Sequence, residues 1–279
     1  MTLGASGGPS SSGGIRFRRP ARGLYELIPD AEVVAPLTTA SPAISTPRRP
    51  QVRRVQRLVQ ADQRLVDLTE HFDEYAAAYD ASVPFRRDGQ YEHHRRTIDR
   101  RLELGSVTEA VVDDEFLRSL RLTLGAWGIG RRASKLLPLD EFGDQLARHA
   151  DELGRLEGIR LEDPSLDLEE VTDAVWQLIN GIGTVKNDAT LVAGSKVLAH
   201  LLPDLVVPID RRWTGRFFSW STPDMQYRQQ QVFEEAFRAF AALARATQPS
   251  RLVGGGWRTT PTKIVDNALI GFCKRHGLT

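Results

Sequence analysis

Lys196 and Asp210 are the two side chains of this sequence best suited to act together on a substrate. Lys196 lies in an apolar segment with helical spacing, residues 191–202, and Pro203 ends that segment. Residues 205–209 form a short apolar, β-branched run that leads back to Asp210. An extended return of this length can bring Asp210 beside Lys196. A lysine at a buried edge next to a carboxylate can act as a nucleophilic amine, or it can simply form an ion pair.

Three short motifs follow one another between residues 177 and 220. They are Gly181-Ile182-Gly183 after a helix, then Gly194-Ser195-Lys196, then Pro208-Ile209-Asp210 before another helix. Their order resembles the helix-hairpin-helix-GPD superfamily of DNA glycosylases. The resemblance implies that the glycine hairpin binds DNA phosphates through backbone amides. It also implies that Lys196 attacks the sugar C1′, and that Asp210 stabilises the developing sugar cation and helps to activate the nucleophile.

The spacing of the motifs departs from the family pattern, in which the hairpin directly precedes the lysine. Here 13 residues separate Gly183 from Lys196. Either residues 191–195 form the hairpin, or Lys186 takes the role of the motif lysine; the G-S-K context and the proline-bounded loop favour Lys196. Asp210 can also serve as a helix N-cap, and two glycines close together are an ordinary way to end a helix.

Aromatic and basic residues around these motifs are candidates for the rest of a DNA site. An extruded base needs aromatic or apolar walls in place of its lost stacking. The candidates for this base pocket are Trp127, Trp213 and Trp220. The candidates for DNA binding are Gly181, Gly183, Lys186, Arg131, Arg132, Arg211, Arg212 and Lys263. The simpler interpretation is core packing for the aromatic residues and a solvated surface for the cations.

Apolar residues recur at helical spacing from residue 52 onward, and alternating, strand-like segments are almost absent. The expected helices cover residues 52–79, 91–104, 107–124, 141–156, 166–179, 191–202, 230–246 and 262–274. We therefore expect an all-α, two-lobed protein of eight or nine helices. Residues 51–165 would form an acidic lobe, and residues 166–279 a lobe with the hairpin-like segment and the candidate catalytic loop. Residues 1–50, rich in Gly, Ser, Pro and Arg, are expected to form a disordered basic arm.

The formal net charge of the 279 residues is only +1, but the charges are unevenly distributed. Residues 1–57 carry nine basic and three acidic residues, and residues 58–185 carry 15 basic and 26 acidic ones. Residues 186–279 carry 13 basic and seven acidic residues. Such an asymmetry favours contact with a polyanion, and the last basic block contains both Lys196 and Asp210.

Several classes of protein are excluded by what the sequence lacks. It has no apolar run long enough to span a membrane and no apolar signal core, and its single cysteine, Cys273, cannot form an internal disulfide. The histidines show no zinc-binding spacing, and there is no phosphate-binding loop or dinucleotide fingerprint. We therefore expect a monomeric, cytoplasmic protein, nucleoid-associated if bacterial, without a metal or cofactor.

Together these patterns predict a DNA glycosylase, with or without AP-lyase activity. It would extrude a damaged or modified base from double-stranded DNA, in repair or in defence against modified phage DNA. If Lys196 is not the nucleophile, Asp210 could activate a water molecule instead. The alternatives are a helical protein that binds nucleic acid without chemistry, and an interaction protein whose acidic lobe binds a basic partner.

Overall fold

The computed structural model describes residues 17–18, 26–27, 49–82, 89–130, 135–186 and 190–278. Most of the expected N-terminal arm lies outside these residues. Two short strands, β1 (Phe17–Arg18) and β2 (Glu26–Leu27), pair in antiparallel fashion. The α-helices are α1 (Arg49–Glu70), α2 (Phe72–Ala81), α3 (Gln90–Leu104), α4 (Val107–Ala110), α5 (Asp114–Ala126), α6 (Leu139–Ala147), α7 (Ala150–Leu156), α8 (Leu168–Gly181), α9 (Thr190–Leu201), α10 (Thr214–Phe217), α11 (Thr222–Tyr227), α12 (Gln229–Thr247) and α13 (Pro261–Arg275), with a 3₁₀ turn at Pro249–Leu252. The expected all-α class is confirmed.

The described residues form thirteen α-helices rather than eight or nine, because tight turns divide three of the expected segments and α11 is an additional short helix. His71 separates α1 from α2, and Arg148 with His149 separates α6 from α7. Between α4 and α5 the carboxylate of Asp113 accepts a hydrogen bond from the Phe116 amide at 2.7 Å, which starts a new helix. Helical spacing of apolar residues continues across each turn, so periodicity alone does not reveal these breaks.

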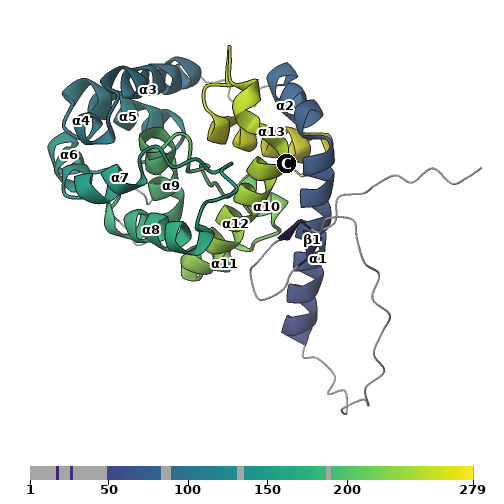
Figure 1. The fold of residues 1–279 in the computed structure, drawn as a ribbon. Helices are drawn as coiled ribbons and strands as arrows, with labels where there is room; N and C mark the ends of the chain where they lie inside the picture. The colour runs from purple at the N-terminus through teal and green to yellow at the C-terminus, as the bar shows by residue number, and fades with distance from the viewer. Residues whose placement is uncertain are drawn as a thin grey trace, which may run out of the picture.

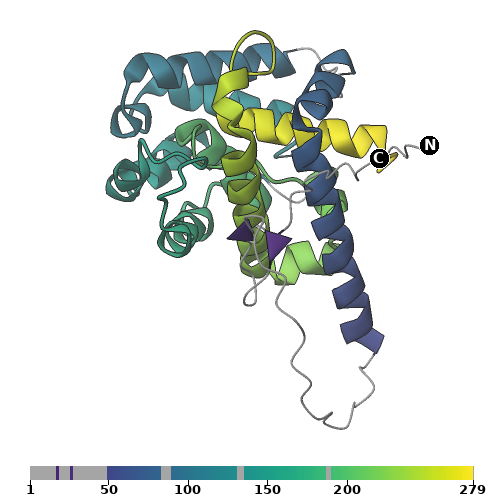
Figure 2. The same cartoon turned by 45° about the vertical axis from the view of Figure 1, so that its right-hand side comes forward.

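The helices pack around one continuous apolar core that includes residues from α1 to α13. In Figure 1, α3 to α7 gather on one side and α1, α2 and α13 on the other, with α9 and α12 between them. The most extensive helix pair is α2 with α13, and Figure 2 shows α13 crossing behind α1. The boundary between two lobes at residue 165 stays a prediction. Within the described part of the chain, no helix is long and apolar enough to cross a membrane.

Candidate functional site

The loop after α9 is held against that helix by a hydroxyl group. The Ile209 amide donates a hydrogen bond to Ser195 Oγ at 3.1 Å, so the residue before Asp210 is fixed beside the residue before Lys196. Asp210 itself is partly exposed, and its Oδ1 accepts a hydrogen bond from the Trp213 amide at 2.7 Å. Asp210 therefore caps the turn that leads into α10. This agrees with the capping role that the sequence offered for Asp210 beside the catalytic one.

The Lys196 amine lies in the interior, although lysine is among the residues that are least often buried. Its residue is 8% exposed, its Nζ donates a hydrogen bond to the Trp127 carbonyl at 3.4 Å, and Nζ lies 5.8 Å from the Trp127 ring centroid. Burial lowers the pKa of the Lys196 amine, and the charge of Lys263 lowers it further. The carboxylates of Asp210 and Asp266 act in the opposite direction. Lys196 and Asp210 thus interact electrostatically, but none of the ion pairs among the described residues joins them directly.

A second buried lysine, Lys263 on α13, faces the same indole ring. Its Nζ lies 5.9 Å from the Trp127 centroid, 5.1 Å from that of Tyr79 and 5.3 Å from that of Trp257. It donates hydrogen bonds to Asp266 Oδ2 at 2.6 Å and to Asn267 Oδ1 at 2.5 Å. Lys263 is only 2% exposed, so the structure places this candidate phosphate contact inside the protein, in an ion pair.

Two buried histidines complete the polar cluster. Their hydrogen bonds form a chain from Thr259 through His94 and His200 to the Lys196 carbonyl oxygen. His200 Nδ1 lies 2.7 Å from the Lys196 carbonyl oxygen, which can only accept, so this nitrogen carries the proton. His94 Nδ1 therefore donates to His200 Nε2 at 3.0 Å, and Thr259 Oγ1 donates to His94 Nε2 at 2.8 Å. His94 also stacks on Trp257, with ring centroids 5.4 Å apart. His200 must be neutral for this chain to exist, and burial lowers the pKa of His94 as well, so that the Thr259 hydroxyl donates to its neutral ring.

The aromatic candidates fall into two groups. Trp127 lies over both buried lysines and is partly exposed, which fits a place at the candidate site. Trp213 and Trp220 are buried elsewhere: Trp220 stacks on Phe218 with centroids 4.6 Å apart, and the Trp213 carbonyl accepts a hydrogen bond from Cys273. Neither indole contacts Lys196 in any interaction that the structure describes, so both are core residues here.

Two segments that follow glycines, residues 135–137 after Gly125, Gly128 and Gly130 and residues 184–186 after Gly181 and Gly183, meet in the structure. Leu136 and Val185 form an isolated antiparallel bridge, and the Lys186 amide donates to the Lys135 carbonyl at 3.0 Å. Lys135 and Lys186 are consequently cross-strand neighbours, and both are exposed. Like charges directly opposite each other are unfavourable unless an anion lies between them. Arg131 and Arg132, two further candidates for DNA binding, lie outside the described residues.

The remaining candidates lie at the surface or at helix ends. Gly183 adopts a left-handed backbone with φ of 56°, as expected for the glycine that reverses the chain after α8. Gly181 is exposed at the last position of α8. Arg211 and Arg212 are exposed in the turn after Asp210, with the Arg212 guanidinium 4.7 Å from the Trp213 ring centroid. These two arginines lie beside the catalytic candidate, as the sequence indicates.

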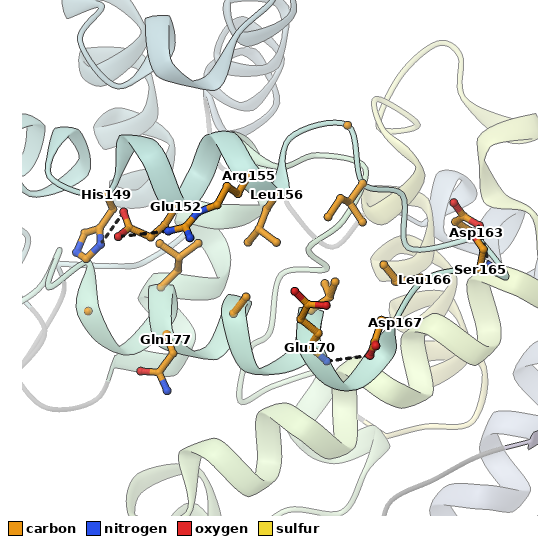
Figure 3. Close-up of a pocket in the computed structure, with 16 residues that line it drawn as sticks. His149, Glu152, Arg155, Leu156, Asp163, Ser165, Leu166, Asp167, Glu170 and Gln177 are labelled. Atoms are coloured by element: carbon orange, nitrogen blue, oxygen red, sulfur yellow. Dashed lines mark hydrogen bonds and ion pairs between the residues drawn. The ribbon is translucent and has the colours of Figure 1, made fainter.

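A groove of about 860 Å³ lies between α7 and α8 (Figure 3). Gly181 lines it, but Lys196 and Asp210 do not. Two of its carboxylates are engaged by neighbours: Glu152 lies 3.9 Å from His149 and 3.8 Å from Arg155, and Asp167 caps α8. Figure 3 shows these side chains along the groove wall. The groove is therefore separate from the buried lysine cluster. Among the described residues, no group of three or more His, Cys, Asp or Glu is arranged to hold a metal ion.

Four of the residues in the cluster, His94, His200, Asp266 and Asn267, were not expected from the sequence. Lys263, Asp266 and Asn267 follow i, i+3, i+4 spacing inside an otherwise apolar helix. Polar residues on the buried face of such a helix are the signal that could have identified them. No comparable local signal connects α13 to Lys196, because that contact is formed only by the tertiary fold.

Gly194 is expected to hold α9 close to α8, and therefore to position Lys196. A Cβ at residue 194 would lie 2.9 Å from the Ile179 carbonyl oxygen and 3.1 Å from its Cα, so the backbone would have to move. Gly194→Ala should lower the free energy of unfolding by about 2 kcal/mol, measured by urea denaturation. Gly255→Ala is the control, because a Cβ there meets nothing within 4 Å. Equal effects of the two substitutions would contradict a packing role for Gly194.

Comparison of the chain with protein-family models, with curated proteins and with solved structures finds no match. The function proposed below therefore depends on the chain's own residues and their geometry.

Proposed function

We propose that the protein is a DNA glycosylase that removes a damaged or modified base from double-stranded DNA. The observation that carries the proposal is the desolvated amine of Lys196, whose pKa burial lowers, on a helix joined by the Ser195–Ile209 hydrogen bond to the loop of the partly exposed Asp210, whose charge acts on that amine. A lysine becomes a better nucleophile when burial or a nearby cation favours its neutral form. The resemblance of the surrounding motifs to helix-hairpin-helix-GPD glycosylases points to the same two residues.

The chemistry would take place at C1′ of the extruded nucleotide. The neutral Lys196 amine would form a bond to C1′ while the glycosidic bond breaks, and the base would leave with that electron pair and take up a proton. The negative charge of Asp210 would stabilise the positive charge that develops on the sugar. After the attached nitrogen loses a proton, its lone pair would form the C1′=N bond while the C1′–O4′ bond breaks and O4′ takes up a proton; the resulting protonated imine is the species from which strand cleavage can proceed. Without attack by Lys196, Asp210 would activate water for simple base release.

The proposed DNA surface includes the neighbouring Lys135 and Lys186 and the exposed Arg211 and Arg212. A phosphate between the two lysines would relieve their mutual repulsion. Trp127 would be the aromatic wall next to the extruded base, since it is the tryptophan candidate that contacts Lys196. The proposal includes a monomeric protein that acts in the cytoplasm, on the nucleoid if the source is bacterial, in repair or in phage defence.

The first experiment asks for base release. The protein is incubated with genomic and phage DNAs that carry different base modifications, and the released bases are identified by mass spectrometry. We expect release from at least one DNA and loss of this release in Asp210→Asn, with DNA binding retained. Retention of DNA on the protein without release from any sample would favour the alternative, a helical nucleic-acid-binding protein without chemistry.

The second experiment separates the two candidate lysines. Borohydride reduction on DNA with an abasic site should give a covalent adduct with the wild type. Lys196→Ala should give no adduct, whereas Lys186→Ala should still give one and should bind DNA more weakly, with a smaller dependence on salt. An adduct that persists in Lys196→Ala and disappears in Lys186→Ala would assign the nucleophile to Lys186. Absence of any adduct would remove the lyase version and leave water activation by Asp210.

A further inference from the structure

Lys196, Lys263 and Asp266 form an unusual arrangement of two ammonium groups and one carboxylate in the interior. Their residues are 8%, 2% and 7% exposed, and both ammonium groups lie within 6 Å of the centroid of the Trp127 ring. Charges in such surroundings are weakly screened, so they act on one another over longer distances than they would at the surface. Each charge in this cluster therefore changes the free energy needed to protonate the others.

Asp266 is engaged by Lys263 and not by Lys196. Its Oδ2 accepts a hydrogen bond from Lys263 Nζ at 2.6 Å, while Asn267 Oδ1 accepts another at 2.5 Å. Asn267 is itself fixed, since its Nδ2 donates to the Trp257 carbonyl at 2.9 Å. Lys263 thus has its carboxylate and amide partners on its own helix, and the buried Asp266 is not the hydrogen-bonded counter-ion of Lys196.

A buried ion pair is weak evidence for a contribution to stability, because removal of two charges from water often costs as much as their attraction returns. The pair of Lys263 and Asp266 has this cost and lies beside a third charged group. Its position next to the candidate nucleophile suggests a role in chemistry. Lys263 repels a proton on Lys196 and also occupies the carboxylate that would otherwise hold that proton.

We propose that Lys263 and Asp266 are positioning residues that set the proton affinity of the Lys196 amine in opposite directions, and this inference rests on the proposed role of Lys196 as nucleophile. Lys263 opposes the charged form of Lys196, and Asp266 limits that effect. Asp210, at the partly exposed end of the return loop, then becomes the carboxylate that responds to charge on the substrate. The two carboxylates have different tasks because one already has a partner.

The other titratable groups around Lys196 do not supply this charge. His200 lies one turn further along α9, and His94 packs against it from α3; burial lowers the pKa of both rings, so they are neutral at pH 7. Tyr79 contributes a phenol from α2, and burial raises the pKa of this hydroxyl, so it is also uncharged. The charges that act on Lys196 are thus those of Asp210, Asp266 and Lys263.

The test measures the protonation of Lys196 directly and needs no DNA. The folded protein is methylated with formaldehyde and cyanoborohydride at a series of pH values, and the modification of Lys196 is followed by peptide mass spectrometry. The exposed Lys135 provides the internal reference. Asp266→Asn should shift the labelling profile of Lys196 to lower pH by about one unit, and Lys263→Met should shift it to higher pH by a similar amount. Lys263→Arg, which keeps the cation, should leave the profile near that of the wild type.

Opposite shifts are the expected result, and a merely structural role cannot produce them. Loosened packing would expose Lys196 in both variants and move both profiles toward higher pH. Shifts in the same direction, or no shift in either variant, would overturn the inference. If Lys263→Met does not fold, Asp266→Asn decides alone, because the inference requires a shift to lower pH. Since the labelling is independent of DNA, this result does not depend on whether base release is observed.

Discussion

Replacement of Gly271 by alanine is expected to lower the free energy of unfolding by about 3 kcal/mol or more. Gly271 lies in α13, where the helix packs against α2. A Cβ at this position would overlap the carbonyl oxygen of Tyr75, and it would lie 2.9 Å from the Tyr75 carbonyl carbon and 3.2 Å from the Tyr79 amide nitrogen. These are backbone atoms, so no side-chain rotation can relieve the clash. The two helices would have to move apart.

The consequence would extend to the candidate site, because the two helices contribute facing parts of it. Tyr79 comes from α2, while Lys263 and Asp266 come from α13. A wider spacing would let water reach the Lys196 cluster, and the interactions between its charges would weaken. We therefore expect Gly271→Ala to reduce base release as well as stability.

Urea denaturation followed by circular dichroism measures the stability effect. The matched control is Gly125→Ala in α5, another helical glycine, where a Cβ meets nothing within 4 Å. Alanine is the better helix former, so this control should be neutral or more stable by up to about 1 kcal/mol. A loss of less than about 1 kcal/mol in Gly271→Ala would show that the α2–α13 contact adjusts easily and does not depend on the glycine.

The contact at Gly271 also illustrates which parts of the fold the sequence can predict. The positions of most helices follow from local spacing of apolar residues, and the all-α class was predicted from this spacing alone. The approach of α2 to α13 joins segments almost 200 residues apart, and Gly271 has no local feature that distinguishes it from Gly125. The turns at His71 and Asp113 were missed for the opposite reason: they are local, but they do not interrupt the apolar period.

The sequence likewise predicts only the part of the candidate site that lies within one stretch of chain. Lys196 and Asp210 share a continuous stretch of chain, and the Ser195–Ile209 hydrogen bond that joins their neighbours lies within the same stretch. Lys263 was predicted as a cation that binds DNA, but its burial depends on tertiary packing, and so does its proximity to Trp127. A charged residue in an apolar helix can face solvent or a buried partner, and a single sequence does not distinguish the two.

Acidification from pH 7 to pH 5 is expected to destabilise the protein through His94 and His200. Burial is the main cause that lowers the pKa of both rings, and that of His200 falls from 6.5 to about 4. The unfolded chain therefore binds protons below pH 6.5 that the folded protein does not bind. The free energy of unfolding is greatest above pH 6.5 and falls as the pH decreases toward 4. For His200 alone the full loss is about 3 kcal/mol, with a slope of up to about 1.4 kcal/mol per pH unit.

The hydrogen-bond chain gives the structural reason for this loss. A proton added to His200 Nε2 would remove the acceptor for His94 Nδ1, so two donors would face each other in the interior, where unpaired polar groups are costly. A proton added to His94 Nε2 would force the Thr259 hydroxyl to turn from donor to acceptor and would place a charge in the interior. Buried carboxyls act in the opposite direction: burial raises the pKa of Asp266, so it takes up a proton more readily in the folded state.

A histidine variant separates the part of the pH dependence of unfolding that comes from His200 from the part that comes from the carboxyl groups. His200→Gln keeps an amide that can donate to the Lys196 carbonyl but has no ring to titrate. Urea denaturation at pH 5, 6, 7 and 8 should show a smaller pH dependence for this variant than for the wild type, by up to about 1 kcal/mol per pH unit between pH 6 and 5. His71→Gln, at a half-exposed position on the surface, is the control for the loss of an imidazole outside the buried chain. Equal profiles for the wild type and His200→Gln would mean that the folded protein accepts protons on this pair, and the neutral chain behind Lys196 would have to be rejected.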